Sequence, residues 1–262
     1  MNKQNLSMLV VAGFACVIFA GCQDAIGVGV SSEEIIDAID GEPEAQEKQS
    51  ATSSAKTTDA KQTDKKVASS ATSKDKSKQQ KVSIATFGNG CYWCTESVFQ
   101  QFDGIYSVVS GFSGGKRKDV TYREVCTGTT GHAEVVQVRY NPSKVTYKQL
   151  LQAFFLTHDP TTKNRQGADI GPQYRSAIFF HDKDQERLAK KAIKDLNAAK
   201  AFKRPIVTEV TKFGFMVPAP KYHQDYFIKN PGDRYCLYNI PSKVAKVRKV
   251  FKNLVKDPAK KK

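Results

Sequence analysis

The sequence predicts an α/β (α+β) domain, a two-layer sandwich in which helices pack on a mixed β-sheet. Segments rich in β-branched and aromatic residues alternate with amphipathic helical patterns, and irregular glycine-bearing loops separate them. An alternation of this kind favours helices layered on a sheet. Residues 81–262 number 182, which is enough for one domain with a substantial core.

The expected elements follow one another along residues 81–262. Five runs have the composition of strands: 82–87, 105–112, 132–140, 174–180 and 206–211. A helix is expected from Tyr92 to about Gln101, directly after the first strand. Three further helices are indicated by apolar stripes: Leu150, Leu151, Phe154 and Phe155; Leu188, Ala192, Ile193 and Leu196; and Val247, Val250, Phe251 and Leu254.

The chain before this domain begins with the pattern of an export signal. Residues 1–22 contain one lysine, an apolar run from Met8 to Ala20, and the sequence Phe-Ala-Gly-Cys. The run is too short to span a bilayer, as is typical of a cleaved leader. Small residues ahead of Cys22 resemble the lipobox of bacterial lipoproteins, in which the leader is removed and this cysteine is acylated. An uncleaved anchor or an ordinary secretory signal is the alternative.

Residues 23–80 have the composition of a tether. They are rich in Ser, Thr, Ala, Lys, Asp and Gln, and they hold too few large apolar residues to offset the entropy of ordering. We predict a disordered, low-complexity segment, except that residues 31–39 have the pattern of a short helix. With the lipobox, this predicts an exported lipoprotein anchored on the periplasmic side of a bacterial cell envelope. A secreted or an inner-membrane-anchored protein is the alternative.

Positive charge is concentrated in the predicted domain. Residues 81–262 hold 32 Lys and Arg residues against 15 Asp and Glu residues, a net charge of +17. Such a field attracts nucleic acid, anionic lipid headgroups or acidic proteins. No basic stripe is interleaved with stacking aromatic residues, and many lysines fall on outward helix faces. We therefore expect a solvated basic surface and no nucleic-acid partner, although the charge would attract the domain to a membrane.

The stretch GNGCYWCTE, residues 88–96, carries the strongest chemical signal. Cys91 falls where a strand gives way to a helix, and the free N–H groups and dipole of a helix N-terminus stabilise a thiolate. With Cys94 it forms a C-x-x-C pair, which also suits disulfide exchange. Tyr92 and Trp93 argue for a pocket instead, because two bulky rings would obstruct another protein's sulfur atoms but would hold a small apolar group.

A carboxyl group is expected on the apolar face of the third strand. Alternation puts Glu134 on the same face as Val136 and Tyr140. Burial would raise the pKa of Glu134 and keep it protonated near neutral pH, which makes it a proton donor. The alternative is an ion pair with a lysine or arginine. Tyr122 and Tyr174 are candidate hydroxyl donors.

Five ordered motifs together resemble one enzyme family. They are GNGCYWCTE (88–96), GFSGG (111–115), YREVCTGTTGHAEVV (122–136), NRQGADIGPQYRS (164–176) and HQDYF (223–227). They are similar to the A-type peptide methionine sulfoxide reductases, which reduce the S epimer of methionine sulfoxide. The resemblance spans residues 82–254 and implies a ferredoxin-like core, repair of oxidised proteins, free methionine S-sulfoxide as a further substrate, no cofactor and a monomer.

The resemblance also implies roles for individual residues. Cys91 would attack the sulfoxide sulfur, and Glu134 would protonate the sulfoxide oxygen. Tyr122 and Tyr174 would hydrogen-bond that oxygen. Asp169 would support the polar side of the site.

The remaining roles concern the methyl group and the return of the enzyme to its reduced state. Trp93 and the ring of Tyr92, a position usually occupied by Phe in that family, would hold the ε-methyl group. Loss of methionine leaves Cys91 as a sulfenic acid, which a second thiol converts to a disulfide. The resemblance favours Cys236 as this thiol, with Cys94 as the alternative or as part of a relay. A thioredoxin-like donor would then reduce the disulfide.

Three other functions stay open on the sequence. A zinc module would use Cys91, Cys94, Cys126 and His132, but only the first pair has zinc-ligand spacing, so we expect no metal. A general thiol–disulfide oxidoreductase is the second, and a basic nucleic-acid-binding or surface-binding protein is the third.

The remaining cysteine and histidines have structural interpretations. Cys126 is expected to be a small buried residue. Loop or surface positions are expected for the other histidines: His158, His181 and His223.

Overall fold

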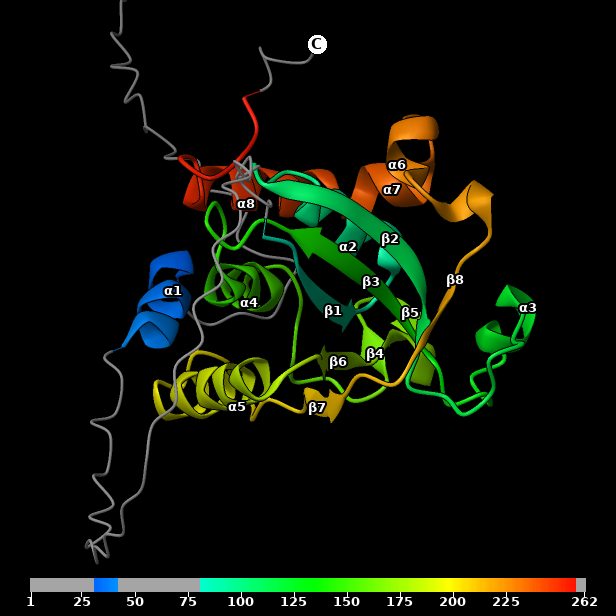
Figure 1. Cartoon of the computed structure of the whole chain (residues 1–262), viewed down its shortest axis with the longest axis horizontal. Coiled ribbons are helices and arrows are strands. Elements are labelled where there is room, and N and C mark those ends of the chain that lie inside the picture. The colour runs from blue at the N-terminus through cyan, green and yellow to red at the C-terminus, as the bar shows by residue number, and fades with distance from the viewer. Residues whose placement is uncertain (1–30, 42–80, 258–262) are drawn as a thin grey trace, which may run out of the picture.

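A six-stranded mixed sheet forms the centre of the molecule, shown in Figure 1 as a computed structural model that describes residues 31–41 and 81–257. In spatial order its strands are β7 (Glu209–Lys212), β6 (Ser176–Phe180), β1 (Ser83–Asn89), β3 (Ala133–Tyr140), β2 (Ile105–Ser113) and β8 (Met216–Pro218). Strands β6 and β7 are parallel, and the other neighbours are antiparallel. A separate hairpin consists of β4 (Arg165–Gln166) and β5 (Asp169–Ile170).

Four strands and two helices make the expected ferredoxin-like core. Along the chain they are β1, α2 (Tyr92–Phe99), β2, β3, α4 (Tyr147–Leu156) and β6, and the strands lie in the order β6-β1-β3-β2. This is the β-α-β-β-α-β arrangement. Thr146 and Gln149 form a capping box that fixes the start of α4. The predicted mixed sheet with packed helices is therefore confirmed.

The main core lies between the sheet and the helices. The ring of Phe87 on β1 is 5.2 Å from that of Phe99 on α2 and 5.4 Å from that of Phe154 on α4, measured between centroids. Helix α8 (Pro241–Val250) packs against both α2 and α4. A smaller cluster occupies the other face of the sheet: Ala133, Val135, Ala177 and Phe179, with Phe213 and Met216 packed on it. Successive residues of β3 therefore point into two different clusters.

The five expected strands and the expected helices are present, with shifted ends. The strand expected at 174–180 begins at Ser176 because a 3₁₀ turn, η1 (Pro172–Tyr174), precedes it, and the strand expected at 206–211 becomes β7. Helix α5 (Lys183–Ala198) follows the second apolar stripe. The sequence did not predict the short elements, which have too few residues for a periodic pattern: β4, β5, β8, α3 (Tyr122–Cys126), η2 (Lys221–His223), α6 (Tyr226–Lys229) and α7 (Arg234–Asn239).

Helix α1 (Ser32–Asp40) confirms the short helix expected at 31–39, and it packs on the domain. It contacts α4 and α5, and Ile35 and Ile39, four residues apart on one face, are buried there. The Gln152 side chain donates a hydrogen bond to the carbonyl of Ile36 at 3.3 Å. Residues 31–41 are thus part of the folded domain and not of a free tether.

The rest of the predicted N-terminal organisation lies outside the described residues. This applies to the leader, to Cys22, and to the tether apart from 31–41. Within the described ranges, no helix combines the length and the apolar character needed to cross a bilayer.

Candidate active site

Cys91 lies at the junction that the sequence predicted, between β1 and α2. Strand β1 ends at Asn89, and Cys91 is the N-cap residue of α2. Gly90 between them has a φ of +96°, and a Cβ atom there would lie 2.6 Å from the Cγ atom of Gln166. A glycine is therefore required for both reasons, because other residues avoid this φ and would collide with Gln166. Only 7% of Cys91 is exposed.

A buried polar network fixes this turn from behind. The Thr95 hydroxyl donates to the Asn89 side-chain oxygen and lies 3.2 Å from the carbonyl oxygen of Cys91. The Asn89 amide in turn donates to the hydroxyl of Thr157 at 3.5 Å. These contacts link the end of β1 to α2 and to the end of α4, so the backbone of Cys91 is held by three elements.

His158 extends the network. It lies in the loop after α4, as expected, but it is fully buried and not at the surface. Its Nδ1 and Nε2 atoms each lie 2.7 Å from a partner, the carbonyl oxygen of Phe154 and the hydroxyl of Ser176. The Ser176 hydroxyl is also 2.7 Å from that of Thr208. Burial lowers the pKa of His158 to about 3. The imidazole is therefore neutral and structural at physiological pH.

The two cysteines of the turn act as a pair. The Cys91 thiol donates a hydrogen bond to the sulfur of Cys94, and the hydroxyl of Tyr235 lies beside both. Burial raises the pKa of Cys91, and the neighbouring Cys94 and Glu134 raise it further. The hydrogen bond from Cys91 lowers the pKa of Cys94 to about 7. The expected lowering of the pKa of Cys91 is therefore wrong, because desolvation outweighs the effect of the helix N-terminus.

Glu134 behaves as the sequence predicted. Only 3% of it is exposed on β3, and burial raises its pKa to about 8, although the backbone N–H of Tyr92, donating at 3.1 Å, opposes the shift. The nearby carboxylate of Asp169 also raises the pKa of Glu134. Its hydrogen-bond partner among the described residues is this N–H group rather than a lysine or arginine. At neutral pH most of the molecules therefore carry a protonated Glu134.

Three further polar groups surround this carboxyl. Tyr122 begins α3 and Tyr174 ends η1, and in both cases burial raises the pKa of the hydroxyl, with Glu134 as a further cause. Asp169 on β5 accepts a hydrogen bond from Tyr235 at 2.6 Å. The structure thus brings together all the polar residues that the resemblance nominated. Tyr235 is an addition that the sequence gave no reason to single out.

The predicted rings stand beside the nucleophile in an aromatic chamber. Trp93 stacks on Tyr226 with ring centroids 3.7 Å apart and planes 6° apart, and it meets the edge of Tyr235 at 6.0 Å. Tyr92 is buried, 5.9 Å from the ring of Phe112. These ring contacts hold the orientation of Trp93 and Tyr92.

His223 completes the chamber and is a functional residue that the sequence analysis missed. It is only 3% exposed, not a surface residue, and its ring lies 4.4 Å from Tyr122 and 5.4 Å from Tyr92. Four buried polar atoms have no partner here: the Tyr92 hydroxyl, Trp93 Nε1 and both nitrogens of His223. Because buried polar atoms are normally paired, the cluster indicates a binding place for a polar ligand. The HQDYF motif was the available signal.

The segment that carries His223 and Tyr226 is held against the core by polar contacts with β2 and α2. Gln224 donates to the carbonyl of Ser110 and accepts from its N–H, each at 2.9 Å, so it pairs with β2 as a strand residue would. The carboxyl of Glu96 lies beneath the backbone N–H groups at the start of α6, and burial raises its pKa to about 7. The chamber wall is therefore anchored by two polar side chains, the buried Glu96 and the half-buried Gln224.

Cys236 lies within α7, next to the same cluster. It is completely buried, and its N–H donates to Asp233 at 2.9 Å. Burial and Asp233 raise the pKa of Cys236 to about 12. Its thiol neighbour is Cys94, which raises the pKa further. Cys94 thus interacts electrostatically with both of the other thiols, Cys91 and Cys236.

The residues of the alternative zinc site do not come together. His132 points away from the chamber, with Nε2 2.8 Å from the carbonyl oxygen of Arg117 and its ring 5.9 Å from Phe215. Cys126 is exposed on α3, which corrects the expectation of burial, because this short helix presents it to solvent. Among the described residues no three His, Cys, Asp or Glu side chains are grouped to hold a metal ion.

Known proteins share this sequence and fold. The family model of the peptide methionine sulfoxide reductases matches residues 83–255. The peptide methionine sulfoxide reductase MsrA of Thermus thermophilus is 47% identical over 173 residues, which cover 66% of this chain and 97% of that protein.

Two solved structures resemble the fold. Reduced Mxr1 from Saccharomyces cerevisiae has a TM-score of 0.55 and 36% identity and covers 60% of this chain and 91% of its own. Methionine sulfoxide reductase A of Corynebacterium diphtheriae has a TM-score of 0.53 and 37% identity, over 59% and 77% of the two chains. With the motifs and the geometry in agreement, this chain belongs to the peptide methionine sulfoxide reductase family, in its A type.

Proposed function

We propose that this protein reduces the S epimer of methionine sulfoxide to methionine, in oxidised proteins and as the free amino acid. One observation carries the proposal. A carboxyl group with a pKa of about 8, Glu134, shares a ring-walled chamber with a buried cysteine, Cys91. A sulfoxide placed there meets a nucleophile at its sulfur and a proton donor at its oxygen.

The first step moves the oxygen from the substrate to the enzyme. The Cys91 proton passes to the hydrogen-bonded sulfur of Cys94, which is partly ionised at neutral pH because its pKa is about 7. Cys94 is the weaker base of the two, so the transfer is unfavourable and the attack on the sulfoxide draws it forward. The Cys91 thiolate attacks the sulfoxide sulfur while Glu134 gives its proton to the oxygen, which Tyr122 and Tyr174 hold. The sulfur–oxygen bond of the substrate breaks, methionine leaves, and Cys91 becomes a sulfenic acid. Protonation of Glu134 also removes a negative charge that would oppose the thiolate.

The chamber explains how the substrate is oriented. Trp93 and Tyr92 offer ring faces to the methyl group, and Glu134, Tyr122 and Tyr174 offer hydrogen bonds to the oxygen. A sulfoxide sulfur is chiral, so fixing the methyl group and the oxygen relative to the attacking Cys91 selects one epimer. Exclusion of water strengthens these hydrogen bonds.

Reduction then proceeds through the three thiols in series. Cys94, already hydrogen-bonded to Cys91, attacks the sulfenic sulfur, and the oxygen leaves as water with the proton of Cys94. Cys236 next attacks Cys94, which releases Cys91 and leaves a Cys94–Cys236 disulfide. This order departs from the preference drawn from sequence, and its support is the electrostatic effect of Cys94 on the pKa of Cys236. The rate of thiol–disulfide exchange depends on which sulfur atom the attacking thiol can reach.

A thioredoxin-like dithiol supplies the two electrons that reduce the final disulfide. The α7 helix carries Cys236, and the neighbouring side chains Leu237 and Tyr238 are exposed, so this side of the site can meet a protein donor. A monomer as the working unit is proposed from the family resemblance alone.

We further propose export and membrane anchoring through Cys22. The support is the lipobox-like sequence alone. The mass of the N-terminal peptide tests this: acylated Cys22 in the membrane fraction supports the proposal, and a soluble cytosolic protein with an intact Met1 contradicts it. Cys22→Ser should release the protein from membranes without changing its reductase activity.

The reductase is tested with one equivalent of each sulfoxide epimer and mass spectrometry of the protein. The S epimer should be consumed with formation of a disulfide, and the R epimer should persist. In Cys236→Ser the disulfide should join Cys91 and Cys94, and multiple turnovers with a thioredoxin-type donor should stall. A Cys91–Cys236 disulfide in Cys94→Ser with wild-type turnover would overturn the proposed order. Reduction of insulin without reduction of either epimer would favour a thiol–disulfide oxidoreductase.

A further inference from the structure

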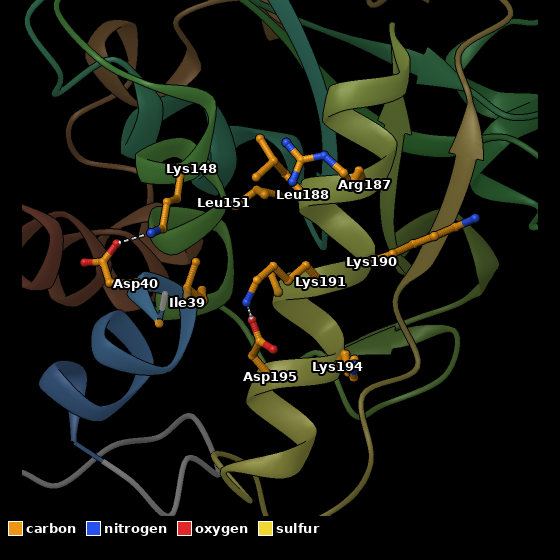
Figure 2. Close-up of a pocket in the computed structure, with 12 residues that line it drawn as sticks. Ile39, Asp40, Lys148, Leu151, Arg187, Leu188, Lys190, Lys191, Lys194 and Asp195 are labelled. Carbon is orange, nitrogen blue, oxygen red and sulfur yellow. Dashed lines mark hydrogen bonds and ion pairs between the residues drawn. The ribbon is translucent and has the colours of Figure 1, made fainter. Parts of the chain in front are cut away.

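A second cavity lies away from the chamber, between α1, α4 and α5. Its volume is about 630 Å³, within the usual range of small-molecule sites (Figure 2). It shares no lining residue with the active site. One wall is α1, which precedes the family match at 83–255 and is therefore an addition to the shared domain.

The cavity is amphipathic. Four apolar residues line it, one from α1, one from α4 and two from α5: Ile39, Leu151, Leu188 and Ala192. Ile39, Leu151 and Ala192 are at most 5% exposed, so the open apolar surface belongs to Leu188 and to the methylene stems of the basic side chains. Five basic residues line the cavity against two acidic ones, and Figure 2 shows Lys148 and Lys191 on opposite sides of the opening. A shallow apolar strip beside cations is complementary to an anion that carries a hydrocarbon tail.

The ion pairs at the rim are weak enough to be exchanged for contacts with such an anion. Lys148 contacts Asp40 at 2.8 Å and Lys191 contacts Asp195 at 2.7 Å, and these side chains are partly open to solvent. Pairs of this kind contribute little to stability, so they can rearrange at small cost when a phosphate arrives. Arg187, whose guanidinium offers a fork of donors, lines the same opening.

We propose that this groove binds an anionic phospholipid, with part of an acyl chain on the apolar residues and the phosphate among Lys148, Arg187 and Lys191. Each buried methylene group of an acyl chain favours binding by about 0.8 kcal/mol. Each basic residue near an anionic surface adds to the attraction.

The position of α1 brings the groove close to a bilayer, and this step rests on the proposed anchoring at Cys22. Because α1 packs on the domain, the chain that connects the anchor to folded structure runs only from Cys22 to Ser31. Nine residues span at most roughly 30 Å. Residues 81–262 carry a net charge of +17, and the four carboxyl groups of α1 reduce it to +13 for the domain with α1. A domain of this charge, held on so short a connection, stays near anionic headgroups.

The test uses the mature chain without lipid, residues 23–262, so that it does not depend on acylation of Cys22. Co-sedimentation is measured with vesicles of phosphatidylcholine alone and with vesicles that also contain phosphatidylglycerol. Arg187→Gln with Lys191→Gln removes two cations of the groove. The matched control, Lys203→Gln with Lys249→Gln, removes two exposed cations elsewhere. Leu188→Trp fills the groove and keeps the charge. None of these residues belongs to the active site.

Binding should require phosphatidylglycerol. It should weaken by about fivefold for each lost groove cation, so by roughly 25-fold in the double variant, while the control stays near wild type. Leu188→Trp should also weaken it, and inorganic phosphate should not compete. Equal losses in the groove variant and the control, or unchanged binding of Leu188→Trp, would overturn the proposal in favour of general surface charge. Sulfoxide reduction with dithiothreitol should be unchanged throughout, which separates this site from the reductase.

Discussion

Two buried polar regions flank Cys91, and they differ in how their hydrogen bonds are satisfied. Behind the turn, both nitrogens of His158 have partners at 2.7 Å. In front of it, neither nitrogen of His223 has one, although both histidines are almost completely buried. The His158 network joins β1, α4 and β6, whereas the chamber with His223 contains the aromatic rings beside Cys91.

The difference separates structural groups from groups kept for a ligand. A buried polar atom without a partner costs about 1–3 kcal/mol, so four such atoms in one chamber are a substantial expense for folding. The same chamber holds a carboxylic acid with a raised pKa. Stability is given up where the substrate binds, and it is maintained where the nucleophile is anchored.

The largest expected effect comes from removing the nucleophile that the two regions share. Cys91→Ser should abolish reduction of methionine S-sulfoxide, because a hydroxyl at this position is not ionised at neutral pH and cannot carry the oxygen. Stopped-flow or end-point consumption of the sulfoxide is the measurement. The control is Cys126→Ser, whose thiol is exposed on α3 and which should keep near wild-type activity.

Glu134→Gln should lower kcat by about 10²–10⁴-fold, which is the usual contribution of a general acid to the rate. Glu134 donates its proton only below its pKa of about 8, so kcat/KM of the wild type should fall as the pH rises through 8. The variant should lose this decrease at alkaline pH.

Glu134→Gln should also be more stable than the wild type above pH 8. A carboxyl group whose pKa is raised in the folded state loses its contribution to folding stability as the pH rises from 4.5 through 8. Unchanged activity would remove Glu134 from the proposed mechanism.

Exchange of the two histidines for leucine tests the comparison directly. His158→Leu should cost about 2–4 kcal/mol of unfolding free energy, because it leaves the partners of a satisfied network unpaired. His223→Leu should change stability by less than about 0.5 kcal/mol, yet it should raise KM for a peptide sulfoxide by about tenfold or more. Chemical denaturation and steady-state kinetics are the measurements. Equal stability losses in both variants, with KM unchanged, would end the distinction between the regions.

The smallest effect is the acid sensitivity of the His158 network. The pKa of His158 is about 3 in the folded protein and has its ordinary value of 6.5 in the unfolded chain, so the unfolded chain binds a proton more readily between these values. Stability is complete above pH 6.5 and is lost as the pH falls. This group alone should lower the unfolding free energy by about 2 kcal/mol between pH 7 and pH 5. The His158→Leu variant should show a correspondingly flatter dependence.

The sequence by itself determined the order of strands and helices, the junction at Cys91 and the face of β3 on which Glu134 lies. These follow from local patterns: alternation along a strand, the apolar stripe of a helix, and glycines at a turn. The raised pKa of Glu134 was predictable for the same reason. Glu134 shares one face of β3 with Val136, and packing of that apolar face removes water from the carboxyl group.

Tertiary structure alone decided the pKa of Cys91, the interaction of Cys94 with Cys236 and the docking of α1. The sequence places Cys91 at a helix N-terminus, which lowers a thiol pKa, but burial, Cys94 and Glu134 of β3 raise it, and the opposing hydrogen bond from Tyr235 of α7 does not compensate. Tyr235 and His223 are far from Cys91 along the chain and adjoin its site only in the fold. Burial and electrostatic coupling depend on such distant neighbours, and no local pattern records them.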